Sequence, residues 1–380
     1  MNSKNILILS SDDWGWKTSK YHISKRLAQE NCVLFVSSIG FRSPTVTKEH
    51  AKRIVARIRS FASGARKTPE GPYTLSPLIV PFVRFPFRDA VNRLLLRLQF
   101  MWNFRKLNFS PDYVFAFSQN WYPFLSLFDS KLIYYCVDDQ TAFSAVDGAR
   151  FLELDRLTNS AADVIFCSSR TLYESKFASY PNTYYSPHGV EYELFRRAVS
   201  ERLPVPSEID GMPGPKLLFF GHLSYDWVDA DLLRYVAKQR PDWNIILIGR
   251  YSFDAGEFSN HSNIFVLGER DFQDLPSYCA HCDVGLIPFV DSELVHNCNP
   301  LKLYEYLSAG LPVVSTAIPE VQHLEDEYVR VSNSATEFVA ECEYLLNTMD
   351  AEKSAALSAS MSDSSWESRV ATITKILHDL

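Results

Sequence analysis

Short apolar segments recur along the N-terminal half of the chain, and segments with helical periodicity separate most of them. The apolar segments that predict strands are KNILILSS, CVLFVSS, YVFAFS, KLIYYCV and VIFCSS. The segment TSKYHISKRLAQE between the first two predicts a helix. Strands without polar alternation are typical of a parallel sheet that helices cover on both faces.

The same alternation restarts after residues 201–215, ERLPVPSEIDGMPGP, a polar stretch rich in proline and glycine that predicts a linker. The later segments that predict strands are KLLFFG, NIILIG, NIFVLG, VGLIPF and PVVST. A chain of 380 residues is too long for one hydrophobic core. We therefore expect an α/β protein with two doubly wound, Rossmann-like domains at 1–200 and 216–363. An amphipathic helix at 364–380 is expected to pack back on either domain.

Composition is typical of a globular protein, with 46% hydrophobic and 22% charged residues. Seven scattered cysteines, mostly in apolar segments, indicate reduced thiols in a cytosolic protein. The N-terminal MNSKNILILSSDDW predicts a first strand and not a signal peptide. No apolar run approaches the ~20 residues that a membrane span needs.

The net charge of -7 hides a basic segment. Between Lys52 and Lys106 there are twelve lysine and arginine residues against only Glu70 and Asp89. Within it, residues 78–106 alternate arginines with large apolar and aromatic side chains, a mixture that fits an anionic membrane surface. The alternative is a core helix at 89–104 with a solvated basic face. Nucleic acid is not expected as a partner, because the chain is acidic overall and carries no recognised nucleic-acid module.

Several predicted strands of the C-terminal half end in glycine. In open parallel sheets ligands bind beyond the carboxyl ends of the strands, where glycine permits close backbone approach. No G-x-G-x-x-G pattern or P-loop follows any strand, which argues against a dinucleotide dehydrogenase. The strand ends that we expect at a ligand are Gly221-His222, Gly249-Arg250 and Gly268-Glu269-Arg270.

The segment NPLKLYEYLSAGLPVVST predicts a helix that begins near Pro300 and ends at Gly310. Lys302 lies in the first turn of this helix, where a cation opposes the helix dipole. An anionic ligand at the helix N-terminus would reverse that penalty. The alternative is an ordinary surface pair between Lys302 and Glu305, which are three residues apart.

These motifs carry a family resemblance that covers nearly the whole chain. The C-terminal half resembles the nucleotide-binding half of GT-B glycosyltransferases, and more narrowly the bacterial family-4-like (group 1) enzymes of surface-polysaccharide synthesis. The C-terminal segments that carry it are FFGHLSYDWVDADLLRYVAKQRPDWNIILIGR, NIFVLGERDFQDLPSYCAHCDVGLIPF and NPLKLYEYLSAGLPVVST. The N-terminal segments are SSDDWGWKTSKYHISKRLA, LIYYCVDDQTAF, ADVIFCSSRTLYE and SPHGVEYELF.

The resemblance implies a nucleotide-diphosphate sugar as donor, with uridine favoured over guanosine. Lys302 would neutralise the diphosphate and stabilise the leaving group, and Glu305 would accept hydrogen bonds from the ribose hydroxyls. No cofactor and no essential metal are expected, since Lys302 and the helix dipole serve the diphosphate. The residues expected at the donor are Gly221, His222, Arg250, Glu269, Arg270, Asn299, Pro300, Leu301, Lys302 and Glu305.

The catalytic group is the point where this chain departs from many relatives. They carry Glu-x7-Glu, and here Asn297 stands in place of the first glutamate. The segment LIYYCVDDQTA is also similar to a strand end in xanthan-type membrane-associated glucuronosyltransferases, where an aspartate serves as base. By position that base would be Asp138, and inversion is favoured over retention, which would need no dedicated base. Other candidates for the base or for the acceptor side are Asp12, Asp13, His22 and Asp139. The alternatives are that Asp139 caps the helix that follows it, that Asp12 or Asp13 caps the first helix, and that His22 is a core residue.

We therefore expect a transferase that moves a sugar to a glycan or polyprenyl-linked acceptor in polysaccharide synthesis. The segment 78–106 would place it peripherally on the inner face of the cell membrane. A GT-B nucleotide-sugar epimerase is an alternative, and a non-catalytic sugar-nucleotide-binding scaffold is another.

Overall fold

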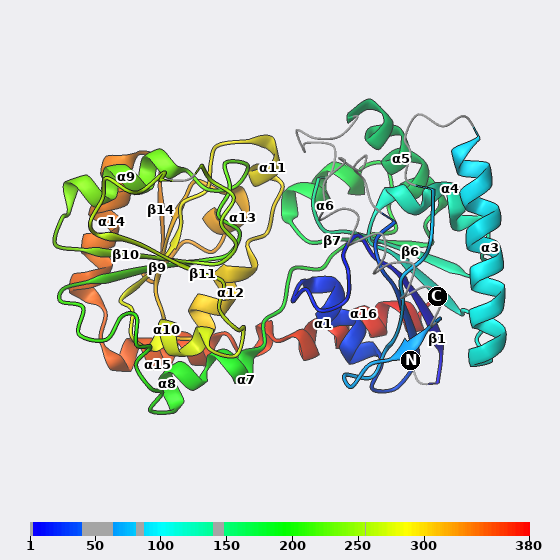
Figure 1. Cartoon of the computed structure of the whole chain (residues 1–380), viewed down its shortest axis with the longest axis horizontal. Coiled ribbons are helices and arrows are strands. Elements are labelled where there is room, and N and C mark those ends of the chain that lie inside the picture. The colour runs from blue at the N-terminus through cyan, green and yellow to red at the C-terminus, as the bar shows by residue number, and fades with distance from the viewer. Residues whose placement is uncertain (1–2, 40–63, 81–86, 140–147, 255) are drawn as a thin grey trace. The chain divides into compact units, whose positions relative to one another are not determined.

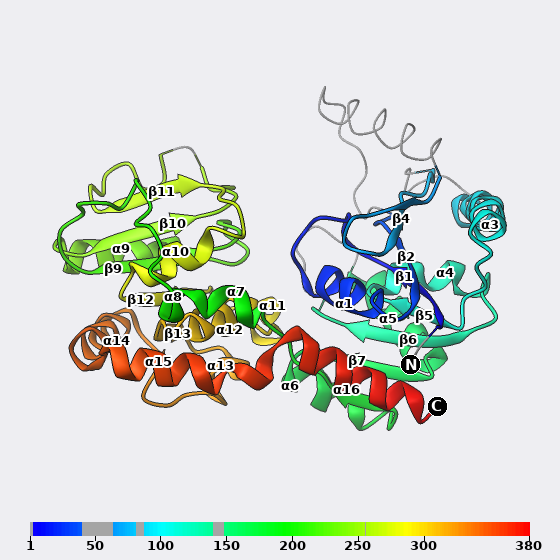
Figure 2. The same ribbon diagram turned by 90° about the horizontal axis from the view of Figure 1, so that it is seen from below.

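The computed structural model describes residues 3–39, 64–80, 87–139, 148–254 and 256–380. The chain forms two compact units (Figures 1 and 2). One unit comprises Met1–Pro187 with Val370–Leu380, and the other comprises His188–Arg369. Each has its own sheet and its own hydrophobic core, so the expected pair of α/β domains is confirmed.

The N-terminal unit is built on a sheet with the strand order β3-β4-β2-β1-β5-β6-β7-β8. All neighbouring strands in it are parallel except the pair of β3 and β4. The strands are β1 (Asn5–Leu9), β2 (Cys32–Val36), β3 (Arg66–Lys67), β4 (Tyr73–Leu75), β5 (Tyr113–Ala116), β6 (Lys131–Cys136), β7 (Val164–Cys167) and β8 (Thr183–Tyr185). The central strands are buried on both faces, as their uniformly apolar sequences predict.

Helices cover both faces of this sheet. The helices are α1 (Ser19–Leu27), α3 (Arg88–Leu107), α4 (Tyr122–Leu125), α5 (Gly148–Ala161), α6 (Arg170–Phe177) and α16 (Trp366–His378), with a 3₁₀ turn at Gln119–Trp121. In Figure 1, α1 and α16 lie on one face of the sheet and α4, α5 and α6 on the other. Because β1 pairs with both β2 and β5, the strand order reverses beside β1, and this reversal marks the expected ligand edge.

The C-terminal unit contains a sheet with the order β11-β10-β9-β12-β13-β14, parallel throughout. Its strands are β9 (Lys216–Phe220), β10 (Asn244–Ile248), β11 (Ile264–Gly268), β12 (Val284–Ile287), β13 (Val313–Thr316) and β14 (Val329–Ser332). Its helices are α7 (Tyr192–Phe195), α8 (Arg197–Ser200), α9 (Ala230–Gln239), α10 (Leu275–Ala280), α11 (Glu293–His296), α12 (Leu301–Ser308), α13 (Pro319–Gln322), α14 (Ala335–Thr348) and α15 (Ala351–Ser360), with a 3₁₀ turn at Ser362–Ser364. The order reverses between β9 and β12, so ligands are expected at the carboxyl ends of these two strands.

The boundary between the units differs from the predicted one. We expected the division in a linker at 201–215, but the units divide between Pro187 and His188. Helices α7 and α8 pack against α10, α12 and α15, so they belong to the C-terminal unit. Phe195 and Ile209 are buried in the core of that unit. Residues 201–215 have the composition of a linker, but buried apolar side chains fix this part of the chain to the C-terminal unit.

The C-terminal helix α16 returns to the N-terminal unit, one of the two placements that the sequence left open. Trp366 belongs to the C-terminal unit, where it is buried against Gly189, while Val370–Leu380 belongs to the N-terminal unit. In the N-terminal unit the hydroxyl of Tyr113 donates to the backbone carbonyl of Leu377 at 3.3 Å.

Two glycines at the ends of β9 and β10 contact each other through their backbones. Gly221 has φ of 146° and Gly249 has φ of 132°, both in the left-handed half of the map where glycine is favoured. A Cβ atom on Gly249 would lie only 2.0 Å from the carbonyl oxygen of Gly221. Glycine at Gly249 is therefore needed for these two strand ends to lie side by side.

Candidate functional site

Helix α12 begins at the carboxyl side of β12, beside the reversal in strand order. Pro300 is its N-cap residue with an extended backbone, and no side chain caps the first turn. Gly310, with φ of 71°, follows the helix in the left-handed conformation that commonly ends helices. The predicted start near Pro300 and end at Gly310 are confirmed.

The ammonium group of Lys302 lies between the two strands where the order reverses. Its Nζ is 5.1 Å from the ring centroid of Phe219, on β9, and 4.4 Å from that of Phe289, just after β12. Such cation–π contacts hold a cation without neutralising it. A Cβ atom on Gly221 would come within 3.5 Å of the Lys302 Nζ, so the bare glycine backbone lies directly beside the amine.

Lys302 and Glu305 do not form the ordinary surface pair that was the alternative prediction. No ion pair joins these two described side chains, although they lie three residues apart on α12. Burial lowers the pKa of Lys302 to about 8, opposed by the nearby Glu305 and Cys298. Burial likewise raises the pKa of Glu305 to about 7, opposed by Lys302. Both groups have lost water, and an anionic ligand beside Lys302 would recover the stabilisation that its charge lacks.

Tyr306 fastens α12 to β9, a role that sequence reasoning missed. Its hydroxyl donates to the carbonyl of Leu218 at 3.1 Å and accepts from the amide of Phe220 at 3.0 Å. Strands β9 and β12 are paired only as far as Leu218 and Gly285, so the tyrosine hydroxyl occupies the gap where the ladder opens. A Cβ atom on Gly285 would lie 2.8 Å from the Tyr306 ring. The sequence signal is a glycine inside an apolar strand, which often marks close packing.

Replacing Tyr306 with phenylalanine is expected to lower the free energy of unfolding by about 1–3 kcal/mol, because two buried backbone groups lose their partner. Urea unfolding measures the change. Tyr344→Phe is a matched control, since Tyr344 is 44% exposed on α14, and it should stay within about 0.5 kcal/mol of the native chain. Equal stability of Tyr306→Phe and the native chain would show that the hydroxyl does not hold the gap.

His222 and Arg250 lie at the same edge of the sheet as Gly221. His222 follows β9 and Arg250 follows β10, and both side chains are exposed. The Nε2 of His222 is 2.8 Å from the hydroxyl of Ser252. Partial burial and the positive Arg250 lower the pKa of His222. The two residues expected at the donor are thus brought together.

Arg270 is engaged in structural contacts. It donates to the Glu208 carboxylate at 2.7 Å and 3.1 Å, to the Tyr278 hydroxyl at 3.1 Å and to the carbonyl of Leu267 at 2.6 Å. Glu269 is exposed and, like Arg270, follows β11, the edge strand. Arg270 therefore ties the 201–215 stretch to this edge.

Asn299 precedes the N-cap of α12 and is buried. Its Nδ2 donates to the hydroxyl of Tyr304 at 3.1 Å, which ties the loop before α12 to the helix itself. Pro300 and Leu301 follow it directly into the helix.

The N-terminal unit gathers carboxylates beyond the ends of β1 and β6. Asp12 accepts hydrogen bonds from the Thr18 hydroxyl at 3.1 Å and from Lys20 Nζ at 2.9 Å. Burial raises the pKa of Asp138, opposed by Lys20 and reinforced by the negative Asp12 and Asp139. The candidate base therefore lies in a cluster with a buried lysine that the sequence analysis did not single out.

The structure also bears on the alternative roles of His22, Asp12, Asp13 and Asp139. His22 is only 2% exposed, which favours its alternative role as a core histidine over contact with an acceptor. The N-cap of α1 is Thr18, so neither Asp12 nor Asp13 caps this helix, and Asp13 is exposed. The suggestion that Asp139 caps the next helix concerns residues 140–147, which lie outside the described part of the chain.

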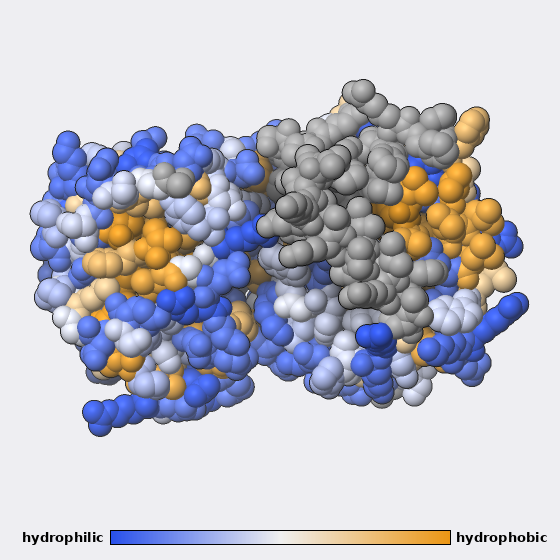
Figure 3. Space-filling model, in the orientation of Figure 1, coloured by the Kyte–Doolittle hydropathy of each residue, from blue (hydrophilic) through white to orange (hydrophobic). Residues whose placement is uncertain are grey.

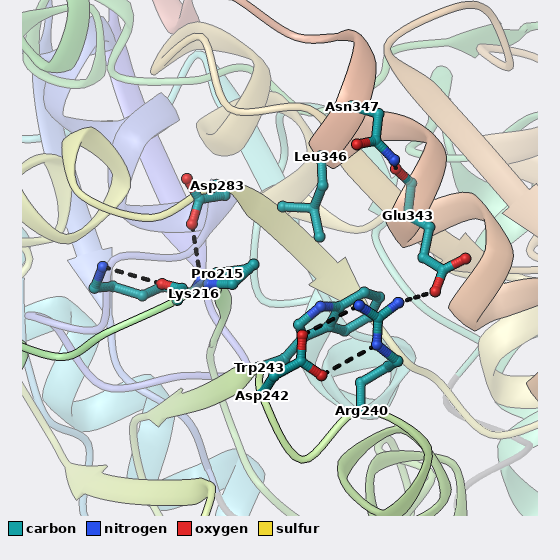
Figure 4. A pocket seen from close by; sticks show the side chains of 10 residues that line it. Pro215, Lys216, Arg240, Asp242, Trp243, Asp283, Glu343, Leu346 and Asn347 are labelled. Atoms are coloured by element: carbon teal, nitrogen blue, oxygen red, sulfur yellow. Dashed lines mark hydrogen bonds and ion pairs between the residues drawn. The ribbon is translucent and has the colours of Figure 1, made fainter.

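A cavity of about 570 Å³ lies at the opposite, amino end of the C-terminal sheet (Figure 4). Three of its charged side chains are paired with each other: Arg240 contacts Asp242 and Glu343, and its guanidinium lies over the Trp243 ring at 4.3 Å. This cavity is remote from Lys302, and in parallel sheets ligands bind at the carboxyl ends. We therefore interpret it as a structural ion-pair cluster. It is lined by Gly214, Pro215, Lys216, Arg240, Asp242, Trp243, Asp283, Glu343, Leu346 and Asn347.

Comparisons with solved structures agree with this architecture. The UDP complex of Alr3699/HepE from Anabaena aligns over all of both chains with a TM-score of 0.67 and 15% identity. Sucrose-phosphate synthase from Thermosynechococcus elongatus aligns over 99% of this chain and 98% of its own, with a TM-score of 0.68 and 13% identity. At such low identity the likeness shows the fold alone. The protein has the GT-B fold, two Rossmann-like units, as predicted.

The sequence comparisons place the C-terminal unit more narrowly. Residues 214–348 match the family described as glycosyl transferases group 1, so this unit carries a group 1 glycosyltransferase domain, as the resemblance implied. TuaH of Bacillus subtilis (strain 168), named provisionally as a teichuronic acid biosynthesis glycosyltransferase, is 30% identical over 196 residues. That match spans about half of this chain and about half of TuaH.

Proposed function

We propose that this protein is a glycosyltransferase that moves a sugar from a uridine diphosphate sugar to an acceptor in polysaccharide synthesis. The observation that carries the proposal is the Lys302 ammonium, held beside the bare backbone of Gly221 without an ion pair among the described residues. The group 1 family match and the polysaccharide role in the name of TuaH support it. The HepE structures contain UDP and UDP-glucose, which favours uridine as the base.

In this proposal the donor diphosphate occupies the carboxyl edge of β9 and β12. Lys302 pairs with the phosphates, and the amides of the first turn of α12 donate to them from the positive end of the helix. Glu305, one turn further, accepts hydrogen bonds from the ribose hydroxyls. His222 and Arg250 border the same edge and contact the phosphates or the sugar.

The chemical step displaces the nucleoside diphosphate from the anomeric carbon. The acceptor hydroxyl attacks this carbon, the bond to the phosphate oxygen breaks, and negative charge accumulates on the leaving phosphate. Lys302 and the α12 dipole stabilise that charge, so donor binding needs no metal ion. Asp138 takes the proton of the acceptor hydroxyl, which gives inversion at the anomeric carbon. Its raised pKa suits a general base better than that of an exposed carboxylate.

We further propose that the acceptor is a glycan or a polyprenyl-linked saccharide bound by the N-terminal unit. Asp13 is exposed and can accept hydrogen bonds from sugar hydroxyls, and Asp139, next to Asp138, is the other carboxylate that we place on the acceptor side. A lipid-linked acceptor would bring the enzyme to the inner face of the cell membrane. None of the helices in the described part of the chain is long and apolar enough to span a bilayer.

Incubation of the purified chain with radiolabelled UDP-sugars and a membrane extract tests the function. Label that moves into glycan or lipid-extractable product is the expected result, and Lys302→Met should strongly reduce it. Release of free nucleotide with an epimerised sugar, without any acceptor, would instead identify an epimerase. Donor binding with no turnover of any UDP-sugar would identify a scaffold.

A further inference from the structure

Helix α3 buries polar side chains and exposes apolar ones, the reverse of an ordinary surface helix. The side chains that it buries include Asn92, Gln99 and Asn103, together with Leu96 and Phe100. The large apolar side chains exposed on the helix or just before it are Phe87 (81%), Leu94 (59%), Leu98 (54%), Met101 (39%) and Trp102 (49%). Figure 3 shows hydrophobic residues gathered over α3 at the right of the molecule.

The buried amides prevent the helix from turning its apolar face inward. Asn92 accepts from the amide of Val80 at 2.7 Å and donates to its carbonyl at 3.1 Å. Gln99 makes the same pair of bonds with Leu78, both at 2.8 Å. Rotation of α3 would leave the partly buried backbone groups of Leu78 and Val80 without these partners, which is costly.

Asn103 fixes the same face one turn further along α3. Its Oδ1 accepts from the amide of Ala65 at 2.7 Å, and its Nδ2 donates to the carbonyl of Gln99 at 2.8 Å. The exposure of the apolar face is therefore built into the fold.

The exposed apolar residues form one stripe, because Leu94, Leu98 and Met101 follow each other at helical spacing. Cations flank the stripe: Arg97, Arg105 and Lys106 are exposed. Among the described residues no carboxylate pairs with them, and the single acid of the helix, Asp89, already pairs with Arg88 and Arg150.

The charge of this face selects its partner. An apolar stripe bordered by cations complements an anionic lipid surface, in which the apolar side chains enter the acyl boundary and the cations meet the phosphates. A second copy related by a two-fold axis would instead bring the arginines of one α3 toward those of the other, which is repulsive.

We propose that the outer face of α3, defined by Leu94, Arg97, Leu98, Met101 and Arg105, docks the protein on an anionic bilayer. This proposal rests on the proposed function only in one respect: a lipid-linked acceptor would lie in the membrane to which α3 binds. It places α3 parallel to the membrane plane, over the ~30 Å that a helix of twenty residues spans.

Co-sedimentation of the full chain with vesicles tests the proposal. Binding to vesicles of equal parts phosphatidylglycerol and phosphatidylcholine should exceed binding to pure phosphatidylcholine and should weaken at high salt. The partition coefficient of the double variant Leu94→Ser/Leu98→Ser should be at least about tenfold lower, since two apolar side chains no longer enter the lipid. Leu152→Ser, at a leucine of α5 that is 62% exposed, is the matched control and should bind as the native chain does. Trp102 is a poorer choice, because its ring packs on Gly64.

Native-like vesicle binding by the double variant would overturn the proposal. So would light scattering that shows a native dimer and a monomeric double variant, because α3 would then be an interface between copies. Calorimetric titration with UDP separates this question from the proposed function. A chain that binds vesicles through α3 but does not bind UDP would refute the transferase and leave the docking surface intact.

Discussion

Replacing Lys302 with methionine is expected to reduce turnover by about 10²–10³-fold, the loss typical when one group that stabilises a developing anion is removed. Methionine keeps the apolar stem against Phe219 and Phe289 but removes the charge that faces Gly221. Single-turnover kinetics with a UDP-sugar measures the chemical step, and calorimetry measures the affinity for UDP, which should also fall. Lys238→Met, at an exposed position of α9, is the matched control and should be silent.

The same substitution should remove a pH dependence of donor binding. The pKa of Lys302 is about 8, so the ammonium form that attracts the diphosphate is lost as the pH rises through that value. UDP affinity of the native chain should therefore decline above pH 8, and that of Lys302→Met should be flat over the same range. Unchanged affinity and turnover in the methionine variant would refute the donor site.

Replacing Asp138 with asparagine is expected to lower kcat by about 10²–10⁴-fold, the usual contribution of a general base. UDP affinity should not change, because the donor contacts lie on α12 and the ends of β9 and β10. The base must be ionised, and burial raises its pKa, so kcat/KM should fall as the pH decreases through this raised pKa. That acid limb should disappear in the asparagine variant.

Asp129→Asn is the control for this experiment, since Asp129 is an exposed carboxylate of the same unit. Near-normal turnover in Asp138→Asn would reject Asp138 as the base and direct attention to Asp12 and Asp139. The anomeric configuration of the product, read by NMR, distinguishes the two mechanisms. A retained configuration would contradict the base mechanism even if Asp138 proved essential.

Local features of this fold were predictable because they depend on neighbouring residues in the chain. Apolar segments predicted the central strands of both sheets, and helical periodicity predicted α1, α12 and α16 to within a few residues. Asp229 precedes α9 and caps it, since its side chain accepts from the amide of Leu232 at 2.9 Å, the ordinary role of an aspartate at a helix start. The place of Lys302 in the first turn of a helix also followed from sequence. Helix polarity makes a cation there unfavourable, which indicated that the position needs an anionic partner.

Contacts between distant segments were not predictable in the same way. Residues 201–215 have the composition of a linker, yet Ile209 and the pairing of Glu208 with Arg270 bind them to the C-terminal unit. The hydroxyl of Tyr306 bonds to residues more than eighty positions away, and no periodicity indicates such a partner.

The sequence by itself thus determined the central strands and several helices, and which side chains carry charge near a strand end. Only the tertiary structure decided which strand ends lie together, because the strand order sets which loops share an edge. It also decided which face of α3 turns inward. Periodicity predicts that apolar residues are buried. Here three side-chain amides instead turn inward to bond buried or partly buried backbone groups, and the apolar stripe is left outside.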